Sequence, residues 1–134
     1  MREGELERVL PGLSRAGNLD GLLVTMPQKF AAAASCATRS DRARRLGVVS
    51  VMRRNPDGSW HGDMLDGIAF VKAQTDAGAR PDGARVLLLG AGGAGSAIAV
   101  AARAAGCATA GGDQMVEAVQ EIMLDFFLER RSEL

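Results

Sequence analysis

The sequence predicts an α/β fold, in which short apolar strands alternate with helices. A continuous aliphatic run over 86–89 is followed by a glycine-rich turn and then by an alanine-rich helix. In the first half of the chain, short apolar runs alternate with segments of helical spacing. Between two of these runs, Asn55-Pro56-Asp57-Gly58 is a strong turn signal that predicts a hairpin. This order of elements favours layers of helix and sheet over an all-helical or all-strand fold.

The opening segment predicts an amphipathic helix, because apolar residues recur at i, i+3, i+4 and i+7 from Leu6 to Leu13. Pro11 should kink or restart this helix. The other elements expected in the first half are a buried strand over 22–25, helices over 30–37 and 41–46, a strand over 48–52 that folds back through Trp60, and a helix over 66–77.

A polar linker with glycine and proline over 78–83 predicts a domain boundary. The aliphatic run over 86–89 predicts a fully buried parallel strand, and the helix after it should reach about Ala105. A last helix opens at Asp113, a candidate N-cap, and carries an apolar stripe that predicts a core or an interface.

Composition excludes several classes of function. Sixteen basic residues balance 16 acidic ones in the 134-residue chain, so no electrostatic case for nucleic acid arises. No apolar run approaches the roughly 20 residues that span a bilayer, and we expect a cytoplasmic protein without a membrane contact. Cys36 and Cys107 lie outside any metal-ligand spacing, which predicts two free thiols and no metal site.

The glycine turn matches G-x-G-x-x-G at Gly90, Gly92 and Gly95, between the expected buried strand and helix. That context predicts a Rossmann-like unit that holds the pyrophosphate of a dinucleotide. A tight turn without a ligand is the alternative. The candidate cofactor-binding residues of this turn are Gly90, Ala91, Gly92, Gly93, Ala94 and Gly95.

The residue that reads the ribose should lie about 20 positions after the first glycine. That count falls on Ala110, near Asp113, which is better interpreted as the cap of the last helix. The sequence therefore predicts a cofactor that is either NADP or NAD, without a residue that selects between them.

Two further motifs precede the glycine turn. Residues 21–29 read Gly-Leu-Leu-Val-Thr-Met-Pro-Gln-Lys, and residues 62–66 read Gly-Asp-Met-Leu-Asp. With the Gly-Ala-Gly-Gly-Ala turn after them, they resemble the shikimate dehydrogenase family, whose motifs are Gly-x-Asn-Val-Thr-x-Pro-x-Lys and Gly-x-Asn-Thr-Asp. The resemblance rests on three motifs that occur in the same order.

By this resemblance, Lys29 and Asp66 are the catalytic pair, and Thr25 and Ser50 lie at substrate-binding positions. The resemblance also implies that the glycine turn holds the cofactor phosphates and that Gly112 contacts the cofactor. Oxidation of a secondary alcohol removes the hydroxyl proton as hydride leaves for the nicotinamide. An amine beside a carboxylate can accept this proton. From spacing alone, a surface lysine and a helix-capping aspartate remain the favoured interpretation.

Several polar positions of the family carry other residues in this chain: Leu23, Ser50, Met64, Leu65 and Val119. The loss of hydrogen-bond partners for hydroxyls predicts a substrate that is less hydroxylated than shikimate or differently shaped.

The resemblance covers nearly all of this chain but only part of a family member, so we expect a shortened form. It implies a partial substrate-binding α/β domain over 1–78, a truncated Rossmann-like NAD(P)-binding unit over 79–112 and a C-terminal helix over 113–134. The implied activity is NAD(P)-dependent interconversion of 3-dehydroshikimate and shikimate, or oxidation of a related cyclic hydroxy acid. An inactive binding or oligomerising module is the alternative. Unpaired strand edges predict a homo-oligomer.

Overall fold

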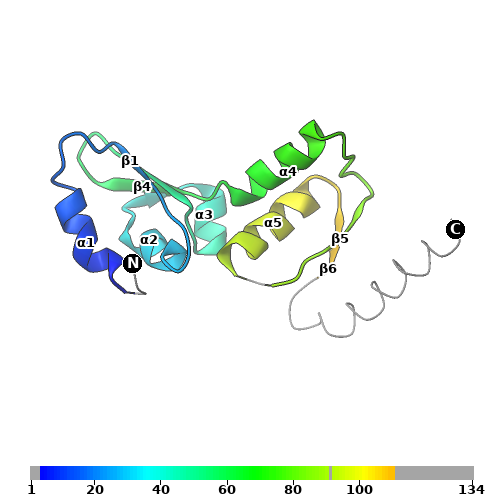
Figure 1. The fold of residues 1–134 in the computed structure, drawn as a ribbon, viewed down its shortest axis with the longest axis horizontal. Coiled ribbons are helices and arrows are strands. Elements are labelled where there is room, and N and C mark those ends of the chain that lie inside the picture. Colours follow the sequence, from blue (N-terminus) through cyan, green and yellow to red (C-terminus); the bar gives the residue numbers. More distant parts are fainter. Residues whose placement is uncertain (1–3, 91, 111–134) are drawn as a thin grey trace, which may run out of the picture. The chain divides into compact units, whose positions relative to one another are not determined.

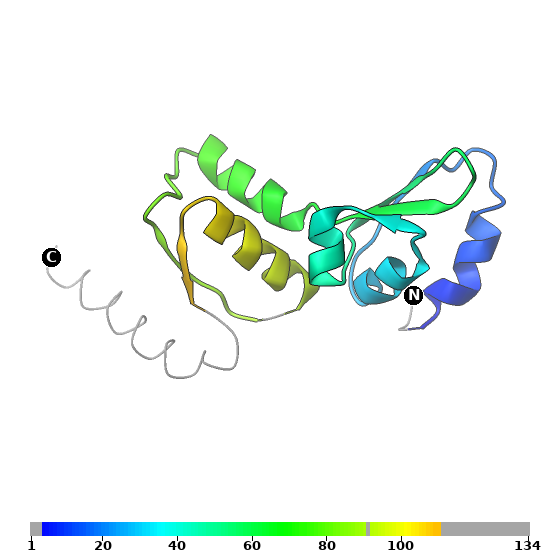
Figure 2. The same cartoon turned by 180° about the vertical axis from the view of Figure 1, so that it is seen from behind.

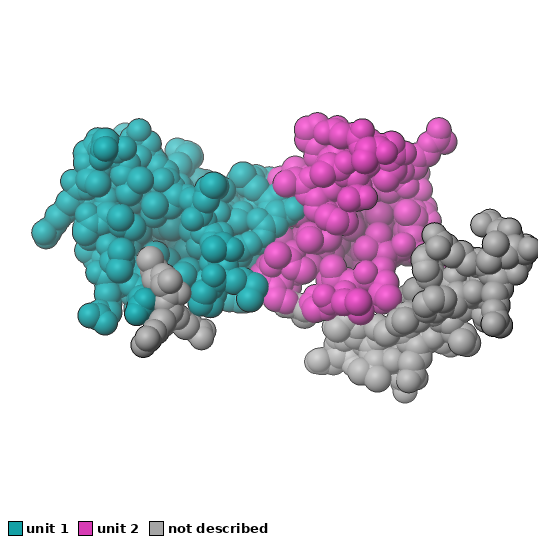
Figure 3. Space-filling view, in the orientation of Figure 1, with its two compact units in different colours: residues 1–66 teal, residues 67–134 magenta. Residues whose placement is uncertain are grey.

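The computed structural model describes residues 4–90 and 92–110. The predictions for Ala91, for Gly112 and for the helix over 113–134 lie outside the described residues. The chain divides into two compact units, Met1–Asp66 and Gly67–Leu134 (Figure 3). The predicted domain boundaries near residues 78 and 112 stay predictions.

Unit 1 is a four-stranded sheet with short helices (Figure 1). Its elements are α1 (Leu6–Leu13), β1 (Gly21–Leu23), α2 (Lys29–Ser35), β2 (Thr38–Arg39), α3 (Asp41–Leu46), β3 (Val51–Arg54) and β4 (Trp60–Asp63). The strand order is β1-β3-β4-β2. β3 is antiparallel to both β1 and β4, and β2 is parallel to β4. These elements confirm the hairpin after β3 and the two helices that the sequence predicts over 30–37 and 41–46.

α1 packs against α2, and both lie on one side of the sheet (Figure 2). The helix does not restart at Pro11, because α1 runs through this residue and ends two residues later. A kink at Pro11 stays a prediction. Arg54 holds the end of α1 by donating to the Ser14 carbonyl at 2.8 Å, while its guanidinium lies over the Trp60 ring. The Trp60 indole N–H donates to the Ser14 hydroxyl at 2.8 Å. These contacts fix the first helix on the hairpin.

Two strand predictions need correction. The strand expected to be buried over 22–25 is the edge strand β1, and its Leu23 side chain is 90% exposed because it points away from the helices. The strand expected over 48–52 begins only at Val51. Val48 and Val49 are fully buried, but they belong to the segment that connects α3 to β3.

Unit 2 contains most of α4 (Asp66–Asp76), followed by β5 (Arg85–Leu87), α5 (Gly93–Ala104) and β6 (Ala108–Ala110). β5 and β6 are parallel, with α5 between them in the chain. α4 lies alongside α5 (Figures 1 and 2), where a side chain on Gly67 would collide with the Ala97 carbonyl. The run over 86–89 is not fully buried as expected, since the described residues give β5 one strand neighbour and Leu89 is 73% exposed. Within the described part, no helix could cross a membrane.

Candidate active site

Lys29 and Asp66 form an ion pair between the ammonium Nζ and the carboxylate Oδ2. The pair is largely withdrawn from solvent, with the Lys29 side chain 10% exposed and the Asp66 side chain 24% exposed. The two groups therefore face each other, as the resemblance implies for a catalytic pair. Their catalytic role stays a prediction.

Sheet topology explains why residues that are 37 positions apart meet. β1 and β4 flank β3 and are both antiparallel to it, so they run in the same direction. Their carboxyl ends therefore lie at one edge of the sheet. Lys29 begins the helix that follows β1, and Asp66 begins the helix that follows β4. Ligand-binding groups gather at such strand ends in α/β proteins.

Ser50, a predicted substrate-binding residue, contacts the backbone next to Asp66. Its side chain is buried, and its hydroxyl Oγ accepts a hydrogen bond from the Leu65 N–H at 2.9 Å. The Ser50 N–H donates to the Asp63 carbonyl at 2.9 Å, and its carbonyl accepts from the Val24 N–H at 2.8 Å. Substrate binding by Ser50 stays a prediction.

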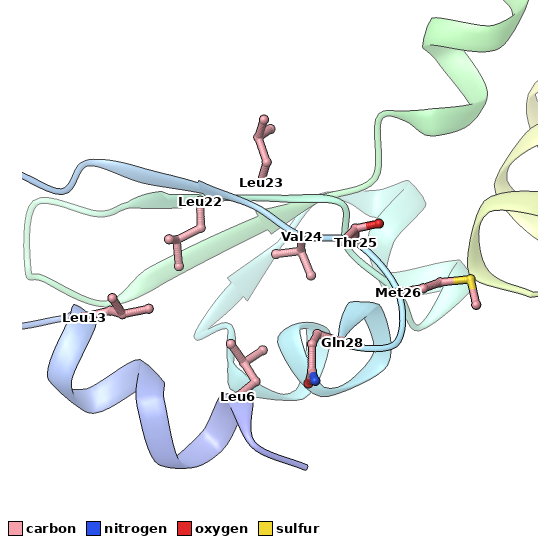
Figure 4. A pocket seen from close by; sticks show the side chains of 8 residues that line it. All are labelled: Leu6, Leu13, Leu22, Leu23, Val24, Thr25, Met26 and Gln28. Carbon is pink, nitrogen blue, oxygen red and sulfur yellow. The ribbon is translucent and has the colours of Figure 1, made fainter. Parts of the chain in front are cut away.

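Thr25, the other predicted substrate contact, is exposed in the loop after β1. This loop, β1 and α1 line a groove of about 210 Å3 (Figure 4). Leu22 and Val24 point toward the helices, whereas Leu23 points to the opposite side of β1. The groove is mainly apolar, and its lining includes neither member of the ion pair. We therefore place the candidate chemistry at the strand ends and not in the groove.

The apolar residues at the family's polar positions differ in their surroundings. Met64 is 1% exposed and is part of the core, so its side chain offers nothing to a ligand. Leu65 is 37% exposed and directly precedes Asp66 in the chain. Val119 lies outside the described residues. The surface next to the ion pair is thus more apolar than the family's motif would make it.

Sequence reasoning missed a network around Asp63, which ends β4. Arg42 donates to this carboxylate through Nε at 2.8 Å and through a second guanidinium nitrogen, and the Ser40 hydroxyl also donates to it. The Met64 N–H adds a bond of 2.7 Å. Desolvation, the largest influence on Asp63, opposes ionisation, but these donors and the Arg42 charge together lower the pKa of Asp63. The one local signal for the network was Ser40, in position to cap the helix that begins at Asp41.

The described glycines of the turn have features that a pyrophosphate site needs. Gly90 has φ +104°, a conformation that side chains disfavour, and a Cβ on Gly95 would lie 2.5 Å from the Gly90 carbonyl oxygen. Gly92, the N-cap of α5, has open space around its Cα, which leaves room for a ligand against the backbone. Gly93 and Ala94 form the first turn of the helix. The described residues of the turn therefore fit the phosphates of a dinucleotide.

No cluster of three metal-binding side chains occurs in residues 4–90 and 92–110. Both cysteines are free thiols. Burial raises the pKa of the Cys36 thiol, against the opposing effect of the nearby Arg39 charge. This thiol lies in the core and is not a candidate nucleophile.

Comparisons of sequence and of structure find related proteins. A shikimate dehydrogenase (NADP(+)) from Halorhodospira halophila is 50% identical over 80 residues, 59% of this chain and 30% of that protein. The crystal structure of shikimate 5-dehydrogenase from Thermus thermophilus in complex with NADP(H) and shikimate has a TM-score of 0.73 at 34% identity, covering 81% of this chain and 40% of that chain. The chain belongs to the shikimate dehydrogenase family.

The family membership confirms the resemblance and the α/β class, and the fold matches the family's amino-terminal, substrate-binding region. The ligand-free 5-ketofructose reductase of a Gluconobacter strain is also similar, with a TM-score of 0.66 at 31% identity over 81% of this chain and 38% of that chain. No family model matches the chain. The chain spans about 30% of the length of the curated relatives that it matches.

Proposed function

We propose that this chain carries the proton-transfer site of an NAD(P)-dependent oxidoreductase that interconverts a cyclic hydroxy acid and its ketone. The substrate class is shikimate, quinate or a related acid with fewer hydroxyls. The observation that supports this most strongly is the Lys29–Asp66 ion pair at the adjacent ends of β1 and β4. The shikimate dehydrogenase relatives and the complex with NADP(H) and shikimate support the choice of reaction.

In this proposal, Lys29 transfers the proton at the reacting oxygen. Its ammonium donates to the carbonyl oxygen when the ketone is reduced, and the neutral amine accepts the hydroxyl proton in the reverse direction. Asp66 fixes the ammonium and accepts a hydrogen bond from the same hydroxyl. Thr25 is exposed in the loop between β1 and α2, and its hydroxyl can bind another polar group of the substrate.

The cofactor, NADP or NAD, supplies hydride transfer when it is bound. We propose that β5, α5 and β6 form a Rossmann-like unit in which residues 90–95 bind the cofactor phosphates. The open space at Gly92 and the close approach of Gly95 to Gly90 support this role. The strand β6 carries Ala108, Thr109 and Ala110, none of which has the positive charge that pairs with a 2′-phosphate or the carboxylate that binds a 2′-hydroxyl. We therefore propose that the chain binds NADP and NAD weakly, with little preference between them. As a separate expectation, we propose a cytoplasmic protein.

Within this class, we propose that an acid with fewer hydroxyls than shikimate is the best substrate. Leu65 beside the catalytic carboxylate and Met64 in the core remove two hydrogen-bonding side chains from the site. A polar hydroxyl that meets an apolar side chain loses its hydrogen bonds to water without replacement.

A steady-state assay of the wild-type chain tests the proposal by following NADPH or NADH formation with shikimate, quinate and 3-hydroxycyclohexanecarboxylate. We expect slow turnover, fastest with the least hydroxylated acid, and a fall of about 100-fold or more in Lys29→Met. Lys72→Met is the matched control, because Lys72 pairs with Asp76 on the exposed face of α4. Equal rates in both variants would refute the catalytic assignment. Absence of turnover with every acid would instead favour a binding or oligomerising module.

A further inference from the structure

Ser50 joins three segments of the candidate site. Its N–H reaches β4 at the Asp63 carbonyl, and its carbonyl receives the Val24 N–H at the end of β1. Its hydroxyl receives the Leu65 N–H at 2.9 Å. The residue is only 7% exposed. All three of its partners belong to unit 1.

Only the hydroxyl contact depends on the side chain. Any residue can supply the backbone N–H and carbonyl, but the acceptor for the Leu65 N–H is the Ser50 Oγ atom. Leu65 immediately precedes Asp66, the first residue of α4. An N–H group before a helix has no partner within that helix, so a side-chain acceptor fixes where the helix begins.

The residue before Ser50 holds the other member of the pair. The Val49 N–H donates to the Lys29 carbonyl at 3.1 Å. Residues 49 and 50 therefore bind the backbone at both helix starts, one beside the ammonium and one beside the carboxylate. A movement of Leu65 would carry the Asp66 carboxylate with it.

We propose that Ser50 is a positioning residue, whose hydroxyl sets the Asp66 carboxylate against Lys29 through the Leu65 backbone and does not touch the substrate. This inference rests on the proposed function, in which the ion pair transfers the proton. It differs from the substrate contact that the family resemblance implies for Ser50. Proton transfer is sensitive to displacements of about 1 Å, so loss of this hydrogen bond affects the chemical step more than binding.

Kinetics of Ser50→Ala separate the two roles. Loss of a positioning residue lowers kcat and kcat/KM together. Loss of a residue that binds substrate and transition state equally raises KM and leaves kcat unchanged. We expect kcat to fall about tenfold with KM changed by less than about twofold. Ser35→Ala is the matched control, since that hydroxyl donates to the Ala31 carbonyl within α2 and makes no contact with the pair. A rise in KM alone would overturn the proposal.

A second measurement does not require turnover. Hydrogen exchange of the Lys29 ammonium protons, followed by 15N NMR, reports whether the carboxylate still holds them. We expect faster exchange in Ser50→Ala, as in Asp66→Asn, and wild-type exchange in Ser35→Ala. Ser50→Cys, which preserves volume with a weaker acceptor, serves if the alanine variant does not fold and should show an intermediate rate. Wild-type exchange in the Ser50 variants would overturn the positioning role, whereas a wild type without turnover would refute only the proposed function.

Discussion

Asp63 shows how one side chain at a strand end organises the region around the candidate site. Its carboxylate receives hydrogen bonds from Arg42, Ser40 and the Met64 N–H, and its carbonyl receives one from Ser50. The side chain thereby ties α3 to the end of β4, three residues before Asp66. Because its donors favour the charged form despite desolvation, the pKa of Asp63 is lowered in the folded state.

The lowered pKa predicts a pH-dependent contribution to stability. A group whose pKa falls on folding stabilises the fold above its unfolded pKa, about 3.9, and this stabilisation is lost as the pH falls through the folded pKa. We expect Asp63→Asn to be less stable than the wild type at pH 7 by on the order of 1 kcal/mol, discounted for the exposure of Arg42. Urea unfolding should show this difference shrinking below about pH 4. Arg42→Met should flatten the same profile, and a difference independent of pH would contradict the assignment.

The element to which we assign cofactor binding in our proposal is the turn between β5 and α5. Gly95 and Gly92 differ in their surroundings, because a Cβ at Gly95 would crowd the Gly90 carbonyl, whereas a Cβ at Gly92 meets no atom of the described residues within 4 Å. The first position is constrained by packing, and the second is open toward the proposed ligand.

Alanine should therefore affect stability at one of these positions and cofactor binding at the other. We expect Gly95→Ala to lower the free energy of unfolding by about 1–3 kcal/mol through overpacking. Gly92→Ala should leave the melting temperature nearly unchanged but weaken NADP binding about tenfold, because its methyl group occupies the space of the pyrophosphate. Calorimetric titration and thermal melting of both variants measure the two effects. Wild-type affinity in Gly92→Ala would exclude this turn as the phosphate site.

At the level of the whole molecule, each unit has a strand with one open edge among the described residues. In unit 1, β1 is an edge strand with Leu23 90% exposed. In unit 2, the described residues pair β5 with β6 alone, and two-stranded sheets are marginally stable by themselves. Apolar strand edges pair readily with another chain.

These edges predict a homo-oligomer. A symmetric dimer can pair two equivalent edges with one contact, so we expect a dimer or larger assembly at micromolar concentration. Sedimentation velocity over a dilution series measures it, with dissociation expected as the concentration falls. A compact monomer with a single cooperative melting transition at every concentration would contradict this expectation.

The sequence by itself determined the α/β class, most of the helices and the hairpin. These depend on periodicity, caps and turn residues within short windows, as at Ser40 before α3 and at the turn over 55–58. Motif resemblance, and not spacing, predicted that Lys29 would meet Asp66.

Only the tertiary structure decided which side chains serve the site and which serve the core. The Arg54 contact with the end of α1 spans 40 positions, and the Ser50 contact with Leu65 spans 15. Such partners depend on how the strands pair, which local patterns do not encode. For the same reason the sequence could not distinguish Met64, buried in the core, from Leu65, which is exposed and directly precedes Asp66. Successive residues in an extended segment point to opposite sides, and the packing of the sheet decides which side is covered.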